Sequence, residues 1–146
     1  MIPDVEGEED LPRSRCLELL SSRSLGRIAL SQRALPTVVP VTYRLVDDRL
    51  VFMAPPESGI LTSVQHPVVA FEVDDIDPGT LAGWSVVVVG VVEGIEADNA
   101  SWSGLVSGGG HVQAGAGDLL AGLITDHISG RRFSPIDFRV THLRET

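Results

Sequence analysis

The sequence contains no lysine, and all eleven of its cationic residues are arginines. Without lysine the chain has no Schiff-base lysine, no P-loop lysine and no lysine contact to a phosphate group. The arginines are also unevenly placed, since none lies between Arg49 and Arg131, an interval that carries ten acidic residues. A phosphate held by charge must therefore be contacted from the first third of the chain, from its last sixteen residues or from a partner subunit.

Cysteine and long apolar runs are also scarce. The single cysteine, Cys16, cannot form an internal disulfide, and its apolar helical surroundings predict a small core residue. No apolar run approaches the roughly 20 residues that a membrane-spanning helix needs. The acidic residues 1–10 lack the basic and apolar layout of a signal peptide, so we expect a cytoplasmic protein. We interpret residues 1–10 as an acidic tail and residues 11–146 as one domain.

Motifs for metal binding and catalysis are missing as well. The formal net charge of −9 opposes binding to nucleic acid, and we expect neither a nucleic-acid nor a membrane partner. The acidic segment 72–77 does not have the spacing of an EF-hand and is interpreted as a solvated turn. The glycine-rich segment 107–117 does not match the dinucleotide fingerprint. The spacing of the four histidines does not match that of metal ligands: His66, His111, His127 and His142. No metal site and no catalytic residue is therefore assigned.

The first half of the chain predicts a helix followed by antiparallel strands. Apolar residues at helical spacing predict a helix over residues 11–22, with Asp10 as its N-cap. A short strand begins at Gly26. Residues 36–46 alternate between apolar and polar side chains, and with residues 49–54 they predict a hairpin that turns at Asp47 and Asp48.

The second half predicts further strands and one more helix. Residues 57–65 are expected to form a short helix, and residues 68–74 alternate as a strand. Residues 83–97 give the longest strand pattern, in which four consecutive valines suggest burial on both faces and two glycines suggest bends. The segment 118–128 fits a helix or a strand, with a strand favoured near its end, and residues 136–143 predict a last strand. Five or six short strands with two small helices indicate a small barrel.

An ordered series of motifs resembles the pyridoxamine 5'-phosphate oxidase-like proteins, a family of flavin-binding split barrels. The motifs are "GRIA", "PVTY", "VDDRLVF", "VAFEVDDID" and "GWSVVVVG", within about residues 11–97, and "SGRRF" is a weaker echo near the end. The resemblance implies a mainly β, antiparallel, Greek-key-like split barrel with a few short helices. It also implies a homodimer that binds a small molecule, namely FMN or in some relatives a deazaflavin or haem, in a cleft between two barrels.

The resemblance further implies a cofactor site of nine residues. Val41, Thr42 and Tyr43 would lie along the flavin ring, Phe52, Met53 and Ala54 at its edge, Ser58 and Gly59 at the phosphate, and Trp84 nearby or at the dimer interface. Relatives commonly have an arginine, a hydroxyl residue and a lysine where this chain has Met53, Ala54 and Ile60, and often an arginine in place of Val89. The expected replacements for these phosphate contacts are backbone amides near Ser58 or cations from elsewhere: Arg27, Arg44, Arg131 or Arg132.

Two functions from different classes follow. In the first, the chain is a flavin-binding protein, and oxidoreductase activity is one option for it. It binds FMN weakly because two or three charge-assisted hydrogen bonds are lost. In the second, the chain has lost its cofactor and acts as a ligand-binding or interaction module. Haem bound through His66 or His111 is a third, lesser alternative. The gap in positive charge from Leu50 to Gly130 is the feature that separates the first two.

Overall fold

The computed structural model describes residues 9–61, 68–95 and 119–134. The described elements are β1 (Glu9–Asp10), α1 (Arg13–Ser21), β2 (Leu25–Gln32), β3 (Leu35–Val46), β4 (Arg49–Ala54), the 3-10 helix η1 (Pro56–Ser58), β5 (Val68–Ile76), β6 (Gly83–Gly94), β7 (Leu119–Ile124) and β8 (His127–Phe133). Four predictions lie outside the described residues: the strand over 136–143, the glycine-rich segment 107–117, residues 1–8 of the acidic tail and haem binding through His66 or His111.

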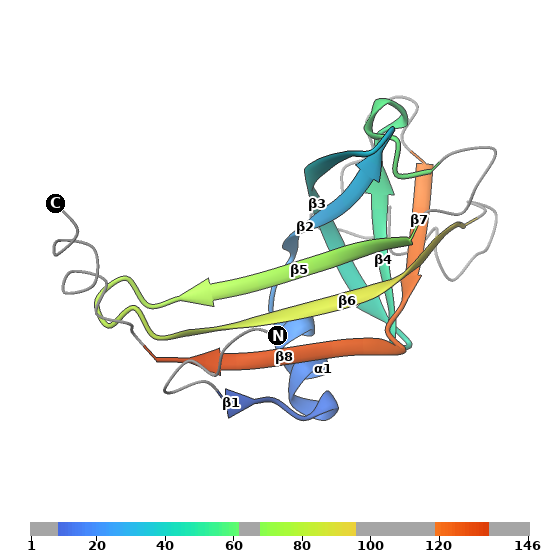
Figure 1. Cartoon of the computed structure of the whole chain (residues 1–146). Helices are drawn as coiled ribbons and strands as arrows, with labels where there is room; N and C mark the ends of the chain where they lie inside the picture. The colour runs from blue at the N-terminus through green and yellow to red at the C-terminus, as the bar shows by residue number, and fades with distance from the viewer. Residues whose placement is uncertain (1–8, 62–67, 96–118, 135–146) are drawn as a thin grey trace, which may run out of the picture.

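Six strands close into an antiparallel barrel in the order β6, β5, β2, β3, β4 and β7, and β7 pairs back to β6. The barrel is split because β6 has two partners on one side. Its first part, from Gly83 to Val89, pairs with β8, whereas Val92 to Gly94 pair with β7. In Figure 1, β5, β6 and β8 run side by side across the view, and β3, β4 and β7 stand steeply at one end. The prediction of a mainly β split barrel is confirmed.

The β3–β4 hairpin forms as predicted. Val46 pairs with Arg49 across a two-residue turn. Both turn residues, Asp47 and Asp48, have positive φ angles of 50° and 60°. This conformation matches the right-handed twist of the strands, and aspartate tolerates it better than most residues do. The register of this hairpin places Tyr43 directly opposite Phe52.

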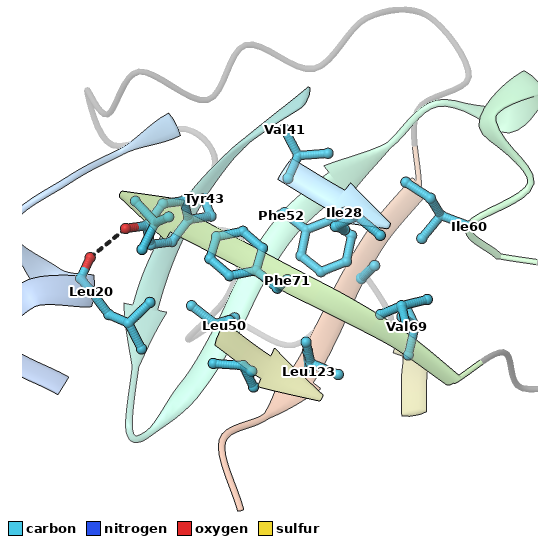
Figure 2. Packing of buried hydrophobic residues seen from close by; sticks show 14 of the residues in the cluster. Leu20, Ile28, Val41, Tyr43, Leu50, Phe52, Ile60, Val69, Phe71 and Leu123 are labelled. Atoms are coloured by element: carbon cyan, nitrogen blue, oxygen red, sulfur yellow. Dashed lines mark hydrogen bonds between the residues drawn. The ribbon is translucent and has the colours of Figure 1, made fainter. Parts of the chain in front are cut away.

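Alternate residues of the strands fill the barrel. Val69, Phe71 and Val73 of β5 are almost fully buried, as their alternation predicts. Figure 2 shows aromatic and aliphatic side chains from β2, β3, β4, β5 and β7 converging in this core. The rings of Tyr43 and Phe71 meet edge to face, with centroids 4.8 Å apart. Each large apolar side chain buried in this way stabilises the fold by roughly 1.5–3 kcal/mol relative to exposure.

The first helix forms within the predicted range and packs against β8, β3 and β6. Cys16 is buried there as a core residue, as predicted. The predicted N-cap is wrong. The N-cap position is held by Pro12, because Asp10 pairs with Arg131 in the sheet and the Leu11 amide donates to the Gly130 carbonyl over 2.9 Å.

The second predicted helix, over residues 57–65, is wrong in its described part. The helical turn is only the three residues of η1, and Gly59 then takes a φ of 73°. This φ favours glycine, and a β-carbon at Gly59 would also displace the side-chain amide of Gln32. The helical turn at Ser58 is therefore too short to offer a helix N-terminus to a phosphate.

The outer face of the sheet carries an exposed apolar row. Residues in direct register across β3, β2, β5 and β6 form this row: Val38, Ala29, Ala70 and Val89. Val38 is 63% exposed and Val89 is 42% exposed. The neighbouring pair Val68 and Val91 is also exposed. The predicted burial of the valine run on both faces is therefore wrong for a single chain, since only Val86 and Val88 point into the core.

Candidate functional site

Four of the nine predicted site residues point into the barrel core. Val41, Tyr43, Phe52 and Ala54 are all buried. The Tyr43 hydroxyl donates to the carbonyl of Leu20 over 2.5 Å, which ties β3 to α1 (Figure 2). Burial raises the pKa of Tyr43 to about 12, so the phenol stays protonated at neutral pH. These side chains hold the barrel together, and only their backbone atoms remain for a ligand outside it.

Thr42 and Met53 point to the other side of the same two strands. Each is half-buried, and each adjoins the Tyr43–Phe52 pair. Because side chains alternate along a strand, both lie on the outside of the barrel. Of the predicted residues on β3 and β4, these two can offer side chains to a ligand there.

Ser58 and Gly59 lie in a turn whose polar groups are already used locally. The Ser58 hydroxyl donates to the Pro55 carbonyl over 2.5 Å and accepts from the Ile60 amide over 3.3 Å. The side-chain amide of Gln32 donates to the Ser58 carbonyl. These bonds fix the turn and leave the hydroxyl with little capacity for a phosphate.

Trp84 lies at the start of β6, on a different strand from the other eight residues. It is half-buried against the core, and the Arg23 guanidinium lies 5.5 Å from its ring centroid. Arg23 also forms an ion pair with Asp75, and this hydrogen bond lowers the pKa of Asp75 below its usual value. The structure therefore brings Val41, Tyr43, Phe52 and Ala54 together in the core cluster, and Trp84 packs against the edge of that cluster.

The positions expected to hold a flavin phosphate do not fit one. Ala54 and Ile60 have no exposed surface, because both side chains fill the barrel core. Met53 faces outward but has no hydrogen-bond donor. The charge-assisted contacts that such a group requires must therefore come from another part of the molecule.

A cavity on the outer face offers donors of that kind. Its volume is about 290 Å³, and its lining residues come from β1, β6 and β8: Asp10, Ser85, Val87, Ser129, Gly130 and Arg131. Ser85 pairs directly with Arg131, and Val87 with Ser129, so these side chains share one face of the sheet. One guanidinium and two hydroxyls form a donor set that suits a phosphate. None of the nine predicted residues lines the cavity, although Arg131 is one of the predicted replacement cations.

A charged cluster lies directly beside the cavity on the same face, because Glu72 pairs with Val87 and Asp74 pairs with Ser85. Arg27 is in register with Glu72, at 3.6 Å between Nη1 and Oε2, and its Nη2 lies 3.3 Å from Oδ1 of Asp74. In the described part of the chain, Nη1 of Arg27 and Oε1 of Glu72 are buried without a hydrogen-bond partner. Burial, and then hydrogen bonding to Asp74 and repulsion from it, raise the pKa of Glu72 to about 7, with Arg27 opposing.

Comparison with known proteins identifies the family. The family model described as pyridoxamine 5'-phosphate oxidase matches residues 12–132. The chain belongs to this family. The match extends from α1 to β8 and so includes the whole described barrel.

Solved structures of FAD-binding proteins share the fold over nearly their whole length. The FAD-binding protein from Mycobacterium smegmatis is 25% identical, with a TM-score of 0.69 over 86% of this chain and 98% of that chain. An FAD-binding protein from Mesorhizobium loti is 26% identical, with a TM-score of 0.71 over 88% and 98%. Rv0080 from Mycobacterium tuberculosis is 36% identical over 87 residues, and the match spans 56% of this chain and 57% of that protein.

Two further properties bear on the kind of ligand. Within residues 9–61, 68–95 and 119–134, no group of three or more histidine, cysteine, aspartate or glutamate side chains is placed to hold a metal ion. The one α-helix of the described part is too short to span a membrane.

We expect Ile60→Lys to destabilise the protein by about 3–5 kcal/mol, because it places an uncompensated charge in the core. Met53→Arg is the matched control and should cost less than about 1 kcal/mol, since its side chain faces outward. Urea unfolding measures both. An Ile60→Lys protein as stable as the natural one would show that this position reaches the surface and that the family's lysine contact is still available here.

We expect Glu72→Gln to stabilise the protein at neutral and higher pH. The folded-state pKa of about 7 exceeds the ordinary value of 4.5, so the folded state resists ionisation of Glu72. This effect is absent below pH 4.5 and grows until the pH passes about 7. The gain in Tm over the natural protein should therefore widen across that range. Glu93→Gln, an exposed change on β6, should show no such widening. A constant gain for Glu72→Gln would contradict the raised pKa.

Proposed function

We propose that the protein binds a flavin nucleotide, with FAD favoured over FMN and a deazaflavin, and that it serves as a flavin-dependent oxidoreductase. The flavin supplies redox chemistry when bound. The protein supplies the cleft, the orientation and the exclusion of water. The observation that carries this proposal is the cavity with a cation and two hydroxyls, in a chain whose fold matches those of FAD-binding proteins over 86% and 88% of its length.

The preference for FAD follows from the phosphate contacts. The resemblance implies that relatives contact the single phosphate of FMN with the residues at positions 53, 54 and 60. Met53, Ala54 and Ile60 cannot make these contacts in this chain. FAD has a second phosphate and an adenosine, and each adds contacts at other places on the surface. A chain that binds one phosphate weakly therefore gains more binding affinity from the extra contacts of FAD.

We further propose that the protein is a homodimer whose two copies meet through the apolar row. Val38, Ala29, Ala70 and Val89 form a contiguous apolar strip across four strands, and Val68 with Val91 extends it. Exposed contiguous apolar surface of this kind marks an interaction site. In a dimer built on a two-fold axis, the same strip serves both copies. The cavity lies on the same face, so it would border the cleft between them.

A cofactor-free module is the second candidate function. The absence of any cation from Leu50 to Gly130, with ten acidic residues in that interval, favours this alternative. The chain would then use its outer face for a partner or an uncharged small molecule.

Flavin binding separates the two candidates. We expect titration of the purified protein to give a dissociation constant for FAD about tenfold or more below that for FMN, which is roughly 1.4 kcal/mol. Isothermal titration calorimetry measures both, and the absorbance spectrum shows any flavin that remains bound during purification. Tighter binding of FMN than of FAD would contradict the stated preference. Absence of binding to either would favour the cofactor-free module.

The dimer is tested by a charge placed in the apolar row. Val89→Asp should convert the dimer to a monomer, because a desolvated carboxylate opposes association. Leu81→Asp is the matched control, since Leu81 is 47% exposed but lies in the turn between β5 and β6. Light scattering gives the mass of each protein. A natural protein with the mass of one chain would overturn the proposed dimer.

A further inference from the structure

We infer that the cavity between β1, β6 and β8 is a phosphate-binding site with Arg131 as its cation. This inference deepens the proposed function, because the occupant in that case is the phosphate group of the flavin. It moves the phosphate contact from the turn after β4, where relatives are expected to have it, to the opposite end of the chain.

The register of three strands creates the site. Arg131 of β8 lies between Ser85 of β6 on one side and Asp10 of β1 on the other. Ser129 is two residues away along β8 and faces the same way, opposite Val87. The Leu11 amide donates to the Gly130 carbonyl over 2.9 Å and helps to hold β1 against β8. A cation and two hydroxyls thus converge from strands that are far apart in the sequence.

The cavity lies at the lower end of the size range of small-molecule sites. Sites that enclose a complete small ligand usually have volumes of roughly 300–1,000 Å³. At about 290 Å³, this cavity has room for the phosphate or pyrophosphate part, and the remainder would extend along the outer face.

Arg27, Arg23 and Arg131 all have interactions within the protein. Arg27 faces Glu72 and Asp74, and Arg23 is paired with Asp75 and stacked on Trp84. Arg131 also has an interaction within the protein. Because a guanidinium carries five N–H donors, such an interaction leaves donors for a ligand. Asp10 lines the cavity, and Glu72 and Asp74 lie opposite its residues Val87 and Ser85, so these three carboxylates should weaken anion binding.

The test compares two adjacent arginines. Arg131→Gln and Arg132→Gln remove the same charge from β8, but Arg132 does not line the cavity. Calorimetry on the full chain measures binding of FMN, riboflavin and inorganic pyrophosphate, and circular dichroism checks that each variant is folded. Riboflavin has no phosphate, so it reports binding of the ring and ribityl chain alone.

We expect Arg131→Gln to weaken FMN binding by roughly tenfold to a hundredfold, the range for a charge-assisted hydrogen bond. Riboflavin binding should stay unchanged. Arg132→Gln should have a much smaller effect on FMN, and Asp10→Asn should tighten FMN binding. Equal losses of FMN binding in the two arginine variants, or an equal loss of riboflavin and FMN binding in Arg131→Gln, would overturn the inference.

Pyrophosphate separates failure of this site from failure of the proposed function. If the natural protein binds no flavin but binds pyrophosphate in a way that Arg131→Gln abolishes, the phosphate site stands and the flavin proposal fails. If the natural protein binds flavin and the Arg131→Gln variant binds FMN as tightly, the flavin proposal stands and the site is wrong. If neither flavin nor pyrophosphate binds, both are overturned.

Discussion

The double pairing of β6 is the constraint on which the rest of the structure depends. One edge of this strand pairs with β5 along most of its length, and the other edge pairs first with β8 and then with β7. The change of partner falls at Gly90, where a β-carbon would lie 3.0 Å from a methyl group of Leu123. Glycine therefore allows β7 to close the barrel tightly at this point while β8 continues as an extension of the sheet.

Closure of the barrel decides which side chains are available for function. Inward residues of β3 and β4 are used by the core, and this includes Tyr43, Phe52 and Ala54. Their chemistry is consequently structural, as the hydrogen bond from Tyr43 to Leu20 illustrates. The extension formed by β8 and β1 adds outer surface, and there the polar groups of the cavity lie beside the exposed apolar row. The proposed ligand site and the proposed dimer contact thus share one face of the molecule.

Local sequence patterns predict those parts of the fold that depend on neighbours in the chain. The alternation in β3 and β5 and the Asp47–Asp48 turn are of this kind. Long-range pairing explains the misses. Asp10 lies in the sheet because β8 is available to pair with it, and the helix expected after η1 ends early because Gln32 of β2 holds the Gly59 turn.

The candidate site also depends on long-range strand pairing, so the sequence could predict only part of it. The resemblance supplied nine residues on β3, β4, the following turn and β6, but alternation puts four of them in the core. The cavity depends on the register of β8 against β6 and β1, and no pattern within any one of these strands reveals that register. The gap in positive charge indicated only that the cation would come from the first third of the chain, from its last sixteen residues or from a partner subunit.

The most direct measurement is a crystal structure of the protein grown with FAD, in which the strong density of the phosphorus atoms locates the pyrophosphate. Our account predicts a pyrophosphate within hydrogen-bond distance of the Arg131 guanidinium, on the outer face that two copies share. A pyrophosphate against the Ser58–Gly59 turn, with Arg131 distant from it, would contradict the account.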